Sequence, residues 1–333
     1  MSEPTRRTIP VDERGYLHEI TEDTVVDTFG TAPGVDAVHV IDPTSVLAIN
    51  AALAAQRPLL VRGRPGCGKS RLAWAAAAIL DRALVPFTVD ARTEPQDLLF
   101  RIDDVARLAT AQLQSSRPDA QGVDHAMDVE RFLQPGPLWW GFDWRTAEKR
   151  SNGQPRPAGD CRPLKPRADW EPSGCVVLID EIDKADPSVP NGLLDALGQR
   201  RFDVRQQPAV QLQEPPPLII IATNEERVVP DAFLRRCLVH HLELPGDREA
   251  LIAYLVLRGR AHFPDLDEAV LTEAAGAIAT DRLALLAQEL AAPGLAEYVD
   301  LLRVVRAQRP GDAGAQVALL KRVQDFALKK HPR

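Results

Sequence analysis

The sequence predicts an α/β fold with a parallel five-stranded sheet, followed by a small all-helical domain. Five short apolar runs alternate with helical segments between residues 41 and 244, which is typical of a parallel sheet with helices on both faces. The first run leads directly into a glycine-rich loop and then a helix. After Pro245 and Gly246 the chain becomes rich in Ala and Leu. These three observations divide the chain into an extension (1–40), a core (41–244) and a helical domain (245–333).

The composition is that of a globular protein with room for two domains. Hydrophobic residues make up 45% and charged residues 26% of the 333 positions. The net charge of −7 argues against nucleic acid as the main partner, because duplex binding needs a basic surface. No signal-peptide core and no run of about 18 apolar residues is present, so we expect no membrane span and a cytoplasmic location. The four cysteines, which lack C-x-x-C spacing, are expected to be reduced thiols: Cys67, Cys161, Cys175 and Cys237.

The chain begins with a polar extension, for which at most a short strand or hairpin is expected. A helix is then predicted from Asp42, the N-cap, and Pro43, in the first turn, through Leu53. It leads into the first apolar strand, Leu59 to Val61.

A phosphate-binding loop follows this strand and matches G-x-x-x-x-G-K-[ST] without a mismatch. Glycines let backbone N–H groups approach phosphate oxygens, and the following helix adds its positive N-terminal end. Lys69 is expected to reach the β- and γ-phosphates, and Ser70 to bind Mg²⁺. A glycine-rich turn with a chance lysine is the weaker alternative. The expected nucleotide-binding residues are Gly63, Arg64, Pro65, Gly66, Cys67, Gly68, Lys69, Ser70 and Arg71.

The second predicted strand, Leu84 to Val89, is followed by a helix start at Thr93 and then by an insertion at about 101–172. The insertion holds one predicted helix, Val105 to Gln114, and an aromatic cluster that includes Trp139 and Trp140. This cluster either packs in the core, which is favoured, or grips a substrate. The Pro-rich tract from Arg145 to Arg167 is expected to form a loop.

The third strand, from Cys175, ends in Asp180 and Glu181. Ligands of parallel sheets lie at the carboxyl ends of the strands, where the phosphate loop also begins. We assign Asp180 to Mg²⁺ and Glu181 to orienting the attacking water, since phosphoryl transfer needs both roles. Without the phosphate loop, the same two acids could merely cap a strand.

The fourth strand, Leu218 to Asn224, ends in Asn224, whose amide can hydrogen-bond the water or the γ-phosphate without repelling it. Before it, a helix and a small hairpin across Gln207 and Pro208 are predicted. After it, Arg235 and Arg236 lie on one helical turn, and either guanidinium could stabilise the charge of a transferring phosphate; Arg236 is the first choice. A turn-forming Asn and a solvated Arg pair are the alternatives. A fifth strand (239–244) and four or five helices follow, with breaks near Pro264, Thr280, Pro293 and Pro310.

This order of motifs resembles the AAA+ ATPases, and most closely their MoxR-like branch. The resemblance covers about residues 41–305 and rests on Gly136–Leu138, Asp180–Ala185 and Pro230–Cys237 together with the phosphate loop. It implies a P-loop NTPase core with a helical lid that binds ATP and Mg²⁺. It also implies a ring, often a hexamer, with active sites between subunits. MoxR-like proteins act as chaperone-like remodellers of a protein partner, commonly beside a von Willebrand factor A domain protein.

Two departures from this family pattern stand out: the insertion, and a lid stretch, Gly294 to Asp300, that lacks the arginine (sensor 2) many AAA+ lids offer to ATP. Two other functions stay open. One is an ATP-binding scaffold or switch with low turnover, which an intact Glu181 disfavours. The other is a nucleic-acid-associated NTPase, which the net charge and the lack of an N-K-x-D motif at Asn224 disfavour.

Overall fold

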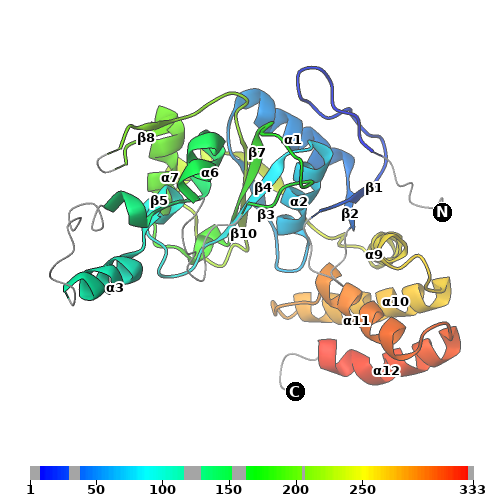
Figure 1. The fold of residues 1–333 in the computed structure, drawn as a ribbon. Coiled ribbons are helices and arrows are strands. Elements are labelled where there is room, and N and C mark those ends of the chain that lie inside the picture. The colour runs from blue at the N-terminus through cyan, green and yellow to red at the C-terminus, as the bar shows by residue number, and fades with distance from the viewer. Residues whose placement is uncertain (1–7, 30–37, 116–128, 152–162, 205–206, 329–333) are drawn as a thin grey trace. The chain divides into compact units, whose positions relative to one another are not determined.

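The computed structural model describes residues 8–29, 38–115, 129–151, 163–204 and 207–328 (Figure 1). Cys161 and the central part of the Pro-rich tract lie outside the described residues.

A parallel sheet of five strands is the central element, as predicted. Its order is β11–β3–β10–β7–β4. The register places Leu218 opposite Val176 and Ala83 opposite Cys175. All six residues of β10 are buried, which explains its continuous apolar sequence. The strands are β3 (Leu59–Arg62), β4 (Ala83–Thr88), β7 (Cys175–Asp180), β10 (Leu218–Thr223) and β11 (Leu238–His241).

The chain divides into two compact units, each described separately below. The first contains residues 1–51, 61–80 and 239–333, and the second contains residues 52–60 and 81–238. The phosphate loop and the C-terminal helices belong to the first unit, and the acidic end of β7 belongs to the second.

An antiparallel hairpin in the first unit forms part of the N-terminal extension. Its strands are β1 (Thr24–Asp27) and β2 (Val38–Ile41), and both contact α2 (Lys69–Ile79). β2 also contacts α9 (Arg248–His262), where Val25, Val38 and Val40 form a small apolar cluster with Ala261. Helix α1 (Pro43–Ala55) begins next to Asp42, whose carboxylate accepts a hydrogen bond from the Ser45 N–H at 2.9 Å, as expected of an N-cap.

Four helices follow β11 within the described residues: α9, α10 (Glu268–Leu286), α11 (Leu295–Gln308) and α12 (Ala313–Leu328). Their apolar faces form one cluster around the fully buried Tyr298. The break predicted near Thr280 is wrong. The Thr280 hydroxyl donates to the Gly276 carbonyl at 2.8 Å, so it is satisfied within a continuous helix.

The aromatic cluster of the insertion belongs to the core of the second unit. Helix α5 (Pro137–Phe142) contacts β4 and β7, and both Trp139 and Trp140 are 4% exposed. The loop predicted from Arg145 onward is wrong in its first part, which forms α6 (Trp144–Ser151). Asp143 begins this helix by accepting the Thr146 N–H, and the first proline of the tract comes only at position 155.

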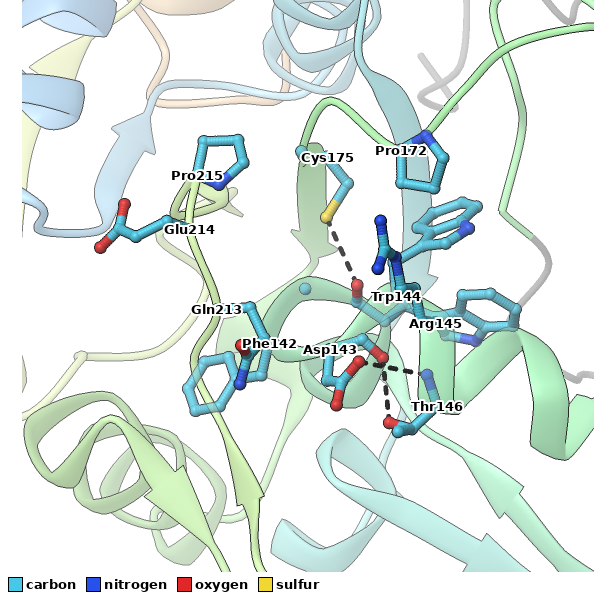
Figure 2. A pocket seen from close by; sticks show the side chains of 13 residues that line it. Phe142, Asp143, Trp144, Arg145, Thr146, Pro172, Cys175, Gln213, Glu214 and Pro215 are labelled. Atoms are coloured by element: carbon cyan, nitrogen blue, oxygen red, sulfur yellow. Dashed lines mark hydrogen bonds between the residues drawn. The ribbon is translucent and has the colours of Figure 1, made fainter.

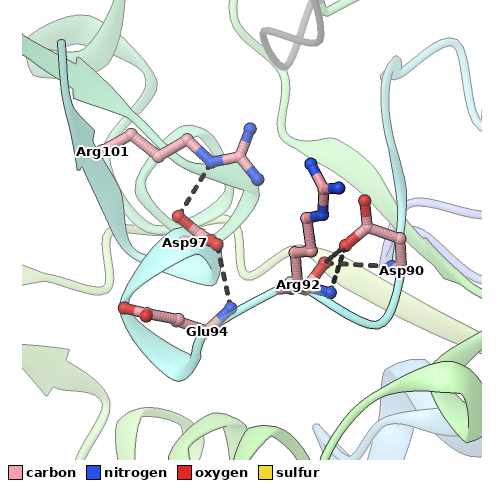
Figure 3. A network of polar contacts seen from close by, with 6 residues as sticks. Asp90, Arg92, Glu94, Asp97 and Arg101 are labelled. Atoms are coloured by element: carbon pink, nitrogen blue, oxygen red, sulfur yellow. Dashed lines mark hydrogen bonds and ion pairs between the residues drawn. The ribbon is translucent and has the colours of Figure 1, made fainter.

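The helix expected from Thr93 is a single 3-10 turn, η1 (Pro95–Leu98), because the chain turns at once into β5 (Phe100–Ile102). Figure 3 shows how this turn is fixed. The Asp97 carboxylate accepts the Glu94 N–H at 2.9 Å and the Arg101 Nε–H at 2.9 Å. β5 then pairs with β6 (Leu133–Pro135).

The remaining elements of the second unit agree with the sequence. α3 covers the predicted insertion helix, β8 and β9 form the predicted hairpin, and α8 is the predicted helical turn. They are α3 (Asp104–Ser115), η2 (Val129–Phe132), η3 (Ile182–Lys184), α7 (Ser188–Gln199), β8 (Arg201–Phe202), β9 (Val210–Gln211) and α8 (Asp231–Leu234).

Candidate functional site

The backbone of the phosphate loop requires glycine at two positions. A Cβ at Gly63 would lie 2.3 Å from the backbone oxygen of Leu242, a distance that only a backbone shift could relieve. Gly68 precedes α2 with φ of 101°, a left-handed conformation that glycine adopts without strain. The positions of these two glycines are therefore a geometric requirement of this loop rather than a coincidence of composition.

Lys69 folds back over the loop. Its ammonium donates to the carbonyl oxygens of Gly63 at 2.7 Å and Arg64 at 2.9 Å, and its side chain is buried. The nearby Cys67 is also buried, and burial raises the pKa of its thiol. Cys67 thus remains neutral, and the positive charge of Lys69 is available to an anionic ligand.

The start of α11 contacts the phosphate loop. The Ala296 N–H donates to the Gly66 carbonyl at 3.3 Å, and the Glu297 carboxylate accepts the Gly294 N–H at 2.9 Å. The stretch from Gly294 to Asp300, which lacks the expected lid arginine, therefore contacts the phosphate loop through its backbone.

Arg282, in α10, is a lid arginine that the sequence argument missed. It is 5% exposed, and its guanidinium donates to the Pro293 carbonyl at 2.8 Å. Burial, and then the charge of Arg64, lowers the pKa of Arg282. Its position on the apolar face of α10, four residues after the buried Ile278, was the available signal.

Glu181 follows β7 in a left-handed backbone conformation, with φ of 60° and ψ of 39°. Non-glycine residues in this region are uncommon and cluster at functional sites. The Asp180 carboxylate accepts the Glu181 N–H at 3.0 Å, and the Glu181 carboxylate forms an ion pair of 2.7 Å with Lys184. This hydrogen bond raises the pKa of Lys184, which is therefore charged beside the carboxylate.

Asp183 joins the ends of β7 and β10, a role that the sequence did not reveal. It is 5% exposed, and its carboxylate accepts the Asn224 N–H at 3.3 Å and the Glu226 N–H at 3.0 Å. The Asn224 backbone is thereby fixed relative to the end of β7. Within the described ranges, the carboxamide of Asn224 has no hydrogen-bond partner.

Arg235 and Arg236 lie on an exposed turn after α8, between two buried anchors, Phe233 and Cys237. Neither guanidinium forms a hydrogen bond or an ion pair with the part of the chain that the structure describes. Within the described residues both cations are therefore exposed and have no carboxylate partner, as a group that acts on an external anion would.

His240 is buried in the first unit. Its Nε2 lies 2.9 Å from the Ser45 hydroxyl, which in turn donates to Asp42 at 2.6 Å. Among the residues that the structure describes, no group of three or more His, Cys, Asp and Glu could hold a metal ion by itself.

A cavity of about 490 Å³ lies beside α5 and α6 in the second unit (Figure 2). It is lined at the amino end of β7 by Gly174 and Cys175, whereas Asp180 ends the same strand. Trp140 and Trp144 line it too, yet their indole N–H groups are buried and lack partners in the described part of the chain. The cavity is distinct from the candidate catalytic residues.

Comparison with known protein families identifies the chain. The sequence model described as the AAA domain (dynein-related subfamily) matches residues 58–237, more than half of the chain. The chain belongs to this AAA domain family. The match begins before the phosphate loop and ends at Cys237, so it includes Asp180, Glu181, Asn224 and both arginines of the exposed turn.

The search of solved structures found matches to this AAA protein at low identity. The Thermotoga maritima RuvB Holliday junction branch migration motor is 17% identical, with a TM-score of 0.38 over 84% of this chain and 67% of that chain. A RuvB mutant from the same organism is 17% identical, with a TM-score of 0.42 over 85% of this chain and 69% of the other. A Cytophaga hutchinsonii ATCC 33406 protein, named as a candidate ATPase, is 14% identical, with a TM-score of 0.35 over 86% and 80% of the two chains.

A search of curated proteins found no match to this AAA protein. Among the helices that the structure describes, none combines the length and apolar character needed to cross a membrane.

Proposed function

We propose that this AAA protein is a Mg²⁺-dependent ATPase. The observation that supports this most directly is the phosphate loop, where Lys69 is held by two loop carbonyls and forms no ion pair with a carboxylate of the described residues. A lysine in this arrangement keeps its full charge, which is what binding of the β- and γ-phosphates requires. Backbone N–H groups of the loop, from Gly63 to Ser70, and the side chain of Arg71 would complete the contacts to ATP.

The donor groups that would hold Mg²⁺ fit its chemistry. Ser70 offers a hydroxyl and Asp180 a carboxylate, and Mg²⁺ prefers oxygen ligands supplied by one or two protein groups together with phosphates. When bound, the ion neutralises charge on the phosphates. Glu181 would orient the attacking water, and Asn224 would hydrogen-bond the water or the γ-phosphate.

Arg236, with Arg235 beside it, would act on the nucleotide of a neighbouring copy. Their exposure, and the absence of partners in the described ranges, supports a role across an interface. This proposal implies a homo-oligomer, and we propose a cytoplasmic ring, often hexameric in the family it resembles. The motifs at Gly136–Leu138 and Asp180–Ala185 support the MoxR-like branch, and with it chaperone-like remodelling of a protein partner such as a von Willebrand factor A domain protein.

One observation favours a second candidate, an ATP-binding switch with low basal turnover. The ion pair of 2.7 Å between Glu181 and Lys184 occupies the carboxylate that hydrolysis needs. A partner protein would then be required to release Glu181. A nucleic-acid-associated function is disfavoured by the net charge of −7.

The test is ATP turnover per subunit, measured over a range of protein concentrations. For the wild type we expect specific activity to rise with concentration, because each site needs its neighbour. Lys69→Ala should lose ATP binding, whereas Glu181→Gln should bind ATP without turnover. Arg236→Ala should bind ATP and lose about 10³-fold or more in turnover. Wild-type protein that binds ATP but never hydrolyses it would favour the switch, and normal ATP affinity in Lys69→Ala would refute the assignment of the loop.

A further inference from the structure

The side chain of Arg57 binds the backbone of the turn that carries Arg235 and Arg236. Its Nε donates to the carbonyl of Arg236 at 3.1 Å, and its Nη2 donates to the carbonyls of Arg235 and of Cys237, the latter at 3.2 Å. One guanidinium therefore holds three successive carbonyl oxygens. All of these residues belong to the second compact unit.

These bonds satisfy carbonyls that lie beyond the local helix. α8 ends at Leu234, so the carbonyls from Arg235 to Cys237 receive no donor from within that helix. The contact continues next to Arg57, where the Leu238 N–H donates to the Pro58 carbonyl at 2.9 Å. The turn is therefore fixed on one side by Arg57 and on the other by the start of β11.

The charge of the turn is not neutralised by this arrangement. Arg57 is bound by carbonyl groups, and the guanidinium groups of Arg235 and Arg236 have no carboxylate partner in the described ranges. The backbone is thus held in place while two cations remain exposed. This combination suits a group that must meet an external anion in a defined orientation, since misplacement by about 1 Å can reduce a rate by about 10²-fold.

We infer that Arg57 is a positioning residue, which orients the Arg235–Arg236 turn towards the phosphates of a nucleotide bound by a second copy of this chain. The inference rests on the proposed ATPase function. It assigns to Arg57 no contact with the nucleotide itself. Its effect must therefore fall on turnover rather than on ATP affinity.

The first test is steady-state ATP hydrolysis by Arg57→Ala. We expect kcat to fall about 10- to 100-fold, with KM for ATP within about twofold of wild type. Arg57→Lys should recover part of the loss, because an ammonium can reach one or two of the three carbonyls. The matched control is Arg167→Ala, which removes an exposed arginine of the same unit that pairs with Asp81, and it should leave kcat unchanged. Normal kcat in Arg57→Ala would overturn the inference.

The second test separates positioning from a general loss of structure. Arg57→Ala and Lys69→Ala are mixed in equal amounts; alone, the first should keep about 1–10% of wild-type activity and the second none. Random assembly joins an intact nucleotide site to an intact arginine turn at one interface in four, so activity should recover towards about a quarter of wild type. Failure to recover any activity would mean that Arg57→Ala damages its own nucleotide site, and would overturn the inference.

Hydrogen exchange gives a readout that does not depend on turnover. The amides from Arg235 to Leu238 should exchange faster in Arg57→Ala than in wild type, while those of the phosphate loop should not change. Unchanged exchange in the turn would refute the contact itself. If wild-type protein hydrolyses no ATP, the proposed function and the inference both fall. If wild type hydrolyses ATP and Arg57→Ala matches it, only the inference falls.

Discussion

Replacement of Asp183 tests how the ends of β7 and β10 are joined. Its buried carboxylate accepts two backbone N–H groups, from Asn224 at 3.3 Å and from Glu226 at 3.0 Å. A hydrogen bond to a charged group contributes about 1.5–3 kcal/mol, and these two are partly buried and one is long. Asp183→Ala should therefore lower the free energy of unfolding of the second unit by about 2–4 kcal/mol. Asp183→Asn keeps one acceptor and should lose about half as much.

The assay is urea denaturation followed by tryptophan fluorescence, since the buried Trp139 and Trp140 report on the same unit. Asp186→Ala is the matched control, because Asp186 is exposed and its carboxylate accepts one backbone N–H, from Ser188 at 2.9 Å. Asp186→Ala should lower the free energy of unfolding by about 0.5–1 kcal/mol. Equal losses for Asp183→Ala and Asp186→Ala would refute the argument that burial and the second hydrogen bond decide the magnitude.

Three further predictions concern single charged contacts. Arg282→Ala should weaken ATP binding about tenfold, measured by calorimetry, because the loop before α11 loses its donor; unchanged affinity would limit Arg282 to packing. Lys184→Ala removes a partly exposed ion pair and so releases the Glu181 carboxylate; basal ATP turnover should rise several-fold, and the free energy of unfolding should fall by less than about 1 kcal/mol. A fall in turnover would instead show that Lys184 orients the carboxylate. Asp23→Ala should lower the free energy of unfolding by about 2–3 kcal/mol, measured by thermal or urea denaturation, because Arg258, whose side chain is 4% exposed, loses its carboxylate partner. A loss below about 1 kcal/mol would mean that water solvates the guanidinium.

The sequence predicts the sheet well because its strands β3, β7 and β10 are continuous apolar runs with a polar residue at the carboxyl end. Leu218 to Thr223 is buried at all six positions, and no other element type suits such a short, β-branched run. The insertion was harder to predict. Its proline count suggested a loop from Arg145, but proline acts only where it stands, and the residues before position 155 form α6. Local composition averaged over a long window concealed this helix.

The residues of the candidate site also fall into those that the sequence predicts and those that it does not. Motif spacing identified the phosphate loop, the acids at the end of β7 and Asn224 as candidates, because phosphate binding needs these residue types in this order and spacing. Asp183, Arg282 and Arg57 were missed. Each binds a backbone group that lies between 11 and 180 residues away in the sequence, and a backbone carbonyl or N–H is not identified by the residue type that carries it.

Three cations of this protein, Lys69, Arg57 and Arg282, share one mode of support: each donates to backbone carbonyls. A carbonyl dipole orients a cation and leaves its charge in place, whereas a carboxylate orients the cation and also neutralises its charge. Arg258, paired with Asp23, shows the contrast within the same chain. A nucleotide phosphate is attracted by net charge, so cations meant to act on it must be held by groups that leave that charge intact. On this argument, placing a carboxylate beside Lys69 would preserve its position and still weaken its attraction for the phosphates of ATP, which separates charge from geometry in a way that removal of the cation cannot.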